Sequence, residues 1–249
     1  MTAENDDLNQ AIEEIQRRWG SHSIGRLADQ SSTPIYYPTS FDMLDAPLNG
    51  GFPSGRMSLI SGRPTSGGLT MTLKTIAQAQ QGGGAVLFID LTHTFDPDYA
   101  FHADVVLDQL TVIRPPNRRQ GLAILREAVT AACFAIIVLD LPEAYLSEPQ
   151  TADLLVDTLD RLWLKLAHSP TALVGLVTCW GGEELRPNPL AHYAAVHLLI
   201  QRHEWLYRQG DINGYIAHVS VLKNRTGNTP QTTLTIPITF QQTVKGDRL

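Results

Sequence analysis

Hydrophobic and polar positions along this chain follow two distinct periods. Short runs that are apolar throughout predict buried strands, and segments whose apolar residues recur every three or four positions predict helices. The expected strands are 57–60, 86–89, 135–139 and 172–178, and the expected helices between them are 69–80, 121–133 and 151–167. Fully apolar strands separated by helices indicate an α/β fold with a mainly parallel sheet and helices on both faces.

The pattern changes after Leu190. Alternating segments at 195–201, 205–208, 215–222 and 233–240 predict consecutive strands, joined by turns such as Gly210-Asp211. This part of the chain therefore predicts a β-meander added to the parallel sheet.

An amphipathic helix is expected near the N-terminus, from about Asp7 to Trp19. Leu8, Ile12, Ile15 and Trp19 fall on one face at helical spacing, and Gly20 follows as a stop signal. Such an apolar stripe needs a surface to cover it, either on this chain or on another.

Composition limits the function classes. A net charge of -6 and a pI of about 5.7 argue against a protein that coats nucleic acid by bulk charge. Cys133 and Cys179 show neither metal-ligand nor redox spacing, so a reduced, cytoplasmic protein without a bound metal is expected. No segment has the roughly 20 apolar residues of a membrane helix. The length of 249 residues suits one large α/β domain or two small ones.

A glycine-rich loop joins the first expected strand to the first core helix. Phosphate-binding loops at this place read G-x-x-x-x-G-K-[ST]: backbone N–H groups cradle phosphates, the Lys contacts them and the hydroxyl holds Mg²⁺. Gly62 and Gly67 stand at the two glycine positions, but Gly68 replaces the Lys and Leu69 the hydroxyl. The degenerate loop comprises Gly62, Arg63, Pro64, Thr65, Ser66, Gly67, Gly68 and Leu69. By itself it is a weak signal, because glycine-rich turns are common.

The surrounding segments resemble the RecA recombinase family. The resemblance covers residues 8–240. It rests on LNQAIEEIQRRWGSHSIGRLAD, LDAPLNGGFPSGRMSLISGRPTSGG, FIDLTHTFDPDYA, AIIVLD and the terminal HYAAVHLLIQR and VSVLKNRTGNTPQTTLTIPI. It implies a RecA-like P-loop NTPase core at 34–242. An oligomerisation-type segment with a helix and a short strand is implied at 1–33, and a tail at 243–249. No counterpart of the family's C-terminal domain is expected.

Several departures from the family pattern bear on ATP hydrolysis. The family's water-activating Glu corresponds to Thr92, which is no base near neutral pH. The γ-phosphate-sensing Gln aligns with Cys179. Asp140 stands at the Mg²⁺-associated carboxylate, with a strand-end residue as the alternative because Leu69 offers no hydroxyl. With the Lys, the metal hydroxyl and the base all missing, no catalytic residue and no useful turnover are expected.

Other family positions are retained or altered. Asp96 and Tyr99 match adenine contacts, with fold maintenance as the alternative. Lys223 and Arg225 match cations that reach the neighbouring subunit's ATP, with a solvated strand end as the alternative. The second DNA-binding loop would lie between Thr178 and Leu190, where Glu183 and Glu184 suit a phosphate backbone poorly. Trp205 and Tyr207 are expected in the core or in an interface.

The leading hypothesis is a non-enzymatic RecA-like accessory or regulator in DNA repair or recombination that acts through protein contacts. It is similar in this respect to the ImuA-type relatives that assist translesion synthesis. The expected partner is an active RecA-type recombinase or a second copy, DNA contact is expected to be weak or indirect, and no cofactor is required, with ATP or ADP bound weakly at most. One alternative is a divergent ATPase that binds ATP and single-stranded DNA. Another is a scaffold or signalling protein unrelated to DNA.

Overall fold

The computed structural model describes residues 3–20, 24, 34–179, 188–227, 229 and 233–240. The chain divides into two compact units, residues 1–34 and 35–249. The expected short strand after Gly20 falls largely, and the tail 243–249 entirely, outside the described residues. Among the helices that are described, none is long and apolar enough to cross a membrane.

The first unit contains a single described helix, α1 (Ala3–Trp19), which confirms the expected amphipathic helix and starts four residues earlier. Gly20 ends it in the left-handed region at φ 99°, where glycine is free of Cβ strain. Within this unit the apolar stripe is poorly covered, because Leu8 is 50% exposed and Trp19 71% exposed. The helix therefore presents an apolar surface that its own unit does not bury.

The second unit is built on an eight-stranded sheet in the order β10-β9-β8-β3-β7-β6-β4-β5. Neighbours from β8 to β5 pair in parallel, whereas β8–β9 and β9–β10 pair antiparallel. The mainly parallel α/β fold and the terminal β-meander are thereby confirmed. A separate two-stranded ribbon, β1 (Tyr36–Tyr37) and β2 (Phe52–Pro53), precedes the sheet.

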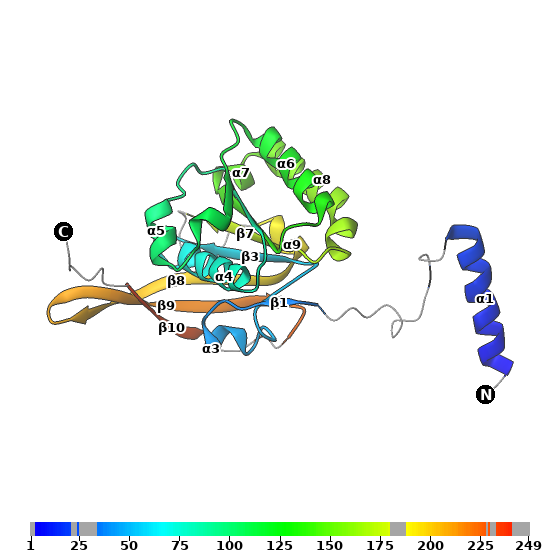
Figure 1. The fold of residues 1–249 in the computed structure, drawn as a ribbon, viewed down its shortest axis with the longest axis horizontal. Coiled ribbons are helices and arrows are strands. Elements are labelled where there is room, and N and C mark those ends of the chain that lie inside the picture. Colours follow the sequence, from blue (N-terminus) through cyan, green and yellow to red (C-terminus); the bar gives the residue numbers. More distant parts are fainter. Residues whose placement is uncertain are drawn as a thin grey trace. The chain divides into compact units, whose positions relative to one another are not determined.

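Helices cover both faces of the parallel sheet (Figure 1). On one face α4 (Gly68–Gln81) packs its Met71, Leu73 and Ile76 into the core. On the other face α6 (Arg118–Ala131) buries Leu122 and Leu125, and α8 (Pro149–Ala167) buries Leu155, Leu159, Leu162 and Leu166. The sheet strands are β3 (Met57–Gly62), β4 (Val86–Asp90), β5 (Leu110–Ile113), β6 (Ile136–Pro142), β7 (Ala172–Thr178), β8 (Ala194–Arg208), β9 (Asp211–Asn224) and β10 (Leu234–Thr239). The short helices are α3 (Asp42–Asp45), α5 (Pro97–His102), η1 (Leu107–Gln109), α7 (Ala144–Ser147) and α9 (Leu190–Tyr193).

The expectation of two strands at 195–201 and 205–208 is wrong, because both belong to the single strand β8. The polar residues between them coincide with a register shift between Arg202 and Glu204, where a β-bulge keeps the strand continuous. Beyond this point β8 pairs only with β9, whereas β9 also pairs with β10 as far as Gly214. Figure 1 shows the β8–β9 hairpin extending past the rest of the sheet.

Candidate functional site

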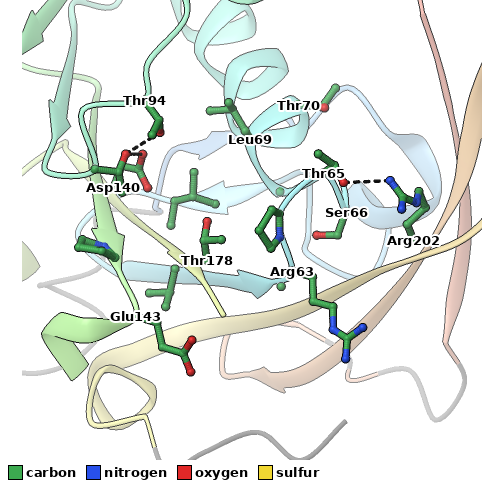
Figure 2. Close-up of a pocket in the computed structure, with 18 of the residues that line it drawn as sticks. Arg63, Thr65, Ser66, Leu69, Thr70, Thr94, Asp140, Glu143, Thr178 and Arg202 are labelled. Atoms are coloured by element: carbon green, nitrogen blue, oxygen red, sulfur yellow. Dashed lines mark hydrogen bonds between the residues drawn. The ribbon is translucent and has the colours of Figure 1, made fainter. Parts of the chain in front are cut away.

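A cavity of about 1210 Å³ opens at the carboxyl ends of β3, β4, β6 and β7 (Figure 2). This edge is where α/β sheets usually bind ligands. The phosphate-loop residues Gly62–Thr70 form one side of the cavity. The other lining residues are Leu91, Thr92, Thr94, Tyr99, Asp140, Pro142, Glu143, Ala144, Ser147, Leu176, Val177, Thr178, Arg202, Trp205, Tyr215 and Phe240.

The two glycines of the degenerate loop are required by packing. A Cβ on Gly62 would lie 2.4 Å from the carbonyl oxygen of Ile200 on β8. Gly67 caps α4 at φ 113°, and a Cβ there would lie 2.6 Å from Cδ1 of Ile238 on β10. Close backbone approach and a left-handed φ both select glycine. The glycine spacing therefore has a structural explanation that does not depend on phosphate.

Apolar groups surround the two substituted loop positions, 68 and 69. A Cβ on Gly68 would lie 3.2 Å from both Ile60 Cγ2 and Leu176 Cδ1, a tight fit against two methyl groups. Leu69 packs partly buried against the core at the position of the expected hydroxyl. Aliphatic side chains thus line the place where the phosphate-loop pattern puts a cation and a metal ligand.

Thr92 lies between two buried carboxylates at the ends of β4 and β6. Its Oγ1 is 3.0 Å from Asp90 Oδ1, 2.8 Å from Asp140 Oδ2 and 2.7 Å from Thr94 Oγ1. A hydroxyl carries one proton, so it cannot donate to both carboxylates at once. Thr92 can hydrogen-bond to both carboxyl groups at once only when one of the two is protonated and donates to it.

The two carboxyl groups have opposite pKa shifts. Burial raises the pKa of Asp140 to about 6, although the Thr92 hydrogen bond lowers it; the charge of Asp90 adds to the increase. Burial also acts to raise the pKa of Asp90, but hydrogen bonds from the Phe95 amide and the Arg114 guanidinium outweigh it and lower the pKa overall. Of the two carboxyl groups, Asp140 is therefore the one that takes up a proton first as the pH falls.

An arginine and three aromatic rings form the opposite wall of the cavity. Arg202 donates from Nη1 to Thr65 Oγ1 at 2.9 Å, and its guanidinium carbon lies 4.2 Å from the centre of the Trp205 ring. Tyr215 lies edge-on to Trp205 and also contacts Phe240. Trp205 therefore belongs to the cavity wall, whereas Tyr207 is 65% exposed on the hairpin rather than in the core. No sequence motif predicted that these residues lie together in a cavity wall.

Among the other expected site residues, only some face the cavity. Tyr99 lines it and hydrogen-bonds to Thr70, while Asp96 instead caps α5 by accepting from the Asp98 and Tyr99 amides. Cys179 follows β7, and its amide donates to the Gly62 carbonyl at 2.8 Å. Residues 180–187, which include Glu183 and Glu184 of the expected DNA-binding loop, lie outside the described residues.

The two expected trans-acting cations differ in their surroundings. The Lys223 ammonium donates to the carbonyl oxygens of Ala191 and His192 at 2.7 and 3.1 Å, so it is held by the C-terminal end of α9 in its own chain. Arg225 is exposed. Of the two, Arg225 is the better placed to reach another molecule, and the trans role of both stays a prediction.

Comparison with known proteins agrees with this architecture. The family model described as the RecA N-terminal domain matches residues 6–157. The chain is 32% identical over 240 residues to Protein RecA of Prochlorococcus marinus (strain MIT 9303), covering 88% of this chain and 63% of that protein. It is 31% identical over 241 residues to Protein RecA of Streptomyces ambofaciens, covering 88% and 65%. It thus spans just under two thirds of these relatives, and it belongs to the RecA family.

Proposed function

We propose that this protein is a RecA-family member without ATPase turnover that serves as an accessory or regulator in DNA repair or recombination through protein contacts. The observation that supports it best is the combination of Gly68, Leu69 and Thr92 around one cavity, with methyl groups of neighbouring residues against Gly68 and an aliphatic side chain at position 69. Phosphoryl transfer relies on charge neutralisation and a positioned water, and these three residues supply neither.

The residues at the metal position do not fit Mg²⁺. Leu69 offers no side-chain oxygen, and Asp140 is buried and hydrogen-bonded to Thr92, whereas Mg²⁺ favours accessible oxygen ligands. Within the described part of the chain, no group of three or more His, Cys, Asp or Glu side chains could hold a metal ion. No step of the proposed function requires one.

A second candidate is a divergent ATPase that binds ATP and single-stranded DNA. The similarity to proteins named RecA favours it, as do the size of the cavity and the presence of Tyr99 and Asp140 in its wall. A measurement of phosphate release from ATP separates the two candidates. Gly68, Leu69 and Thr92 predict that this chain releases no phosphate.

The accessory role predicts an effect on an active recombinase. When this protein is titrated into the RecA-type recombinase of the same organism on single-stranded DNA, filament length and ATPase rate are expected to change. Deleting residues 1–20 should remove the effect, because α1 carries an apolar stripe that its own unit leaves exposed. Arg225→Ala should weaken it, because this exposed cation matches the family's contact to a neighbouring subunit.

Arg119→Ala is the matched control for that experiment, since Arg119 is also exposed but lies on α6. It should leave the effect intact. Unchanged filament length and ATPase rate, together with no complex by light scattering, would show that the protein does not act on this partner.

A further inference from the structure

The projecting part of the β8–β9 hairpin leaves one edge of β8 without a partner strand. β3 pairs with β8 only as far as Ile200, so residues 204–208 of β8 have β9 on one side alone (Figure 1). Within the described part of the chain, no backbone hydrogen bond joins the other edge of these residues to another segment. Unpaired N–H and C=O groups along a strand edge can accept a further strand.

This free edge is suited to strand pairing rather than protected against it. Its centre, residues 205–207, is Trp-Leu-Tyr, and aromatic residues favour strands. Trp205 is 38% exposed and Tyr207 65% exposed, so both have surface to bury. Residues 204–208 contain no proline, which would interrupt pairing, and their two charges, Glu204 and Arg208, have opposite signs.

The side chains along the free edge alternate between the two faces of the hairpin. Trp205 lies against Tyr215 on the cavity side, and Tyr207, two residues further along the strand, shares that face. Glu204, Leu206 and Arg208 therefore belong to the opposite face. Each face thus carries a pair of side chains that attract one another, an aromatic pair on one face and a charge pair on the other.

A second copy of the same strand fits this edge in one register. When a two-fold axis passes through Leu206, Glu204 lies opposite Arg208 of the second copy, and Trp205 lies opposite Tyr207 of the second copy. Symmetry makes each of these contacts twice. Moving the axis by one residue in either direction places Glu204 opposite an uncharged residue. Charge complementarity therefore selects the register centred on Leu206.

We propose that this protein forms a symmetric dimer through the free edge of β8, in which two hairpins join as a continuous antiparallel sheet in the order β9-β8-β8-β9. Glu204 and Arg208 set the register, and the aromatic pairs add apolar contact. The contact is confined to residues 204–208, and small interfaces are usually weak. The dimer is therefore expected to exchange with the monomer, with a dissociation constant on the order of 10 µM. It does not depend on the accessory role proposed above.

The test is the mass of the full chain by sedimentation equilibrium, which should rise from monomer to dimer between about 1 and 300 µM. Glu204→Arg and Arg208→Glu each turn two attractive pairs into two repulsive ones, so each should weaken the dimer about tenfold or more. The double variant Glu204→Arg, Arg208→Glu makes the pairs attractive again and should restore the dimer. Arg208 lies opposite Asp211 on β9, so melting curves verify that the variants with Arg208→Glu fold.

A cysteine introduced on the two-fold axis tests the register. Leu206→Cys, in a Cys133→Ser background that removes the exposed natural thiol, should form a disulfide between two copies under mild oxidation. Ile212→Cys in the same background is the matched control. Ile212 is exposed on the same hairpin but lies on β9, one strand further from the axis, so its thiols should not meet.

Glu127→Arg is the control for the charge variants, because it reverses an exposed charge on α6 and should dimerise as the natural chain does. The inference is overturned if the natural chain stays monomeric over the whole concentration range. It is also overturned if folded Glu204→Arg dimerises as well as the natural chain, since the contact would then lie on another surface. A folded double variant that does not recover the dimer would equally contradict it.

Discussion

The triple variant Gly68→Lys, Leu69→Thr, Thr92→Glu is expected to bind Mg²⁺–ATP at least about tenfold more tightly than the natural chain. The Lys restores a charge-assisted contact to phosphate and the Thr restores a hydroxyl for the metal. The structure adds two consequences. Ile60 and Leu176 must shift by a few tenths of an ångström to admit the Lys, because its Cβ would lie 3.2 Å from each. A Glu at position 92 also places a third carboxylate beside Asp90 and Asp140.

Without metal, the triple variant should therefore melt below the natural chain, and Mg²⁺–ATP should raise its melting temperature by binding the folded state. Calorimetric titration and thermal unfolding in EDTA and in Mg²⁺ measure both effects. Gly68→Met is the matched control, since it introduces similar bulk without a cation and should gain no affinity. A folded triple variant with no affinity for Mg²⁺–ATP would mean that the missing loop residues do not explain the properties of the cavity.

Asp140→Asn is expected to stabilise the protein at pH 8 by about 2 to 3 kcal/mol in metal-free buffer. The pKa of Asp140 is raised to about 6 in the folded state, against about 3.9 in the unfolded chain, and one unit corresponds to about 1.4 kcal/mol. The folded state therefore binds more protons between these values, so stability is full below about pH 4 and falls as the pH rises to about 6. Asn has no proton to lose and avoids that decrease.

Urea unfolding at pH 4, 6 and 8 measures this difference, which should be near zero at pH 4 and largest at pH 8. Glu127→Gln is the control, because it neutralises an exposed carboxylate on α6 and should show no such trend. If Asp140→Asn destabilises the protein equally at all three pH values, the carboxylate is ionised and well paired in the folded state, contrary to the cluster described here.

Much of the fold could be predicted from hydrophobic pattern, because buried parallel strands such as 172–178 are apolar throughout. β5 was not predicted, because it is a short edge strand whose residues are only partly buried. The bulge in β8 was mistaken for a break, because a polar run in sequence does not distinguish a turn from a bulge.

The candidate site was predictable only where it follows a motif. The sequence alone shows the loop, and it shows that the Lys, the hydroxyl and the Glu are replaced. The bridging position of Thr92 is not, because it depends on the pairing of β4 with β6, which brings Asp90 opposite Asp140. Arg202 and its aromatic neighbours come from the β8–β9 hairpin and from Phe240, more than 130 residues after the loop begins, and no spacing rule connects them to it.

The most direct measurement of the central claim is phosphate release from Mg²⁺–ATP by the natural chain, with and without single-stranded DNA. With Gly68, Leu69 and Thr92 at the positions of the Lys, the metal hydroxyl and the base, release is expected to equal that of a control lacking the protein. Single-stranded DNA should make no difference. Release above the control that is stimulated by single-stranded DNA and abolished by Asp140→Ala would contradict the account and identify a working ATPase.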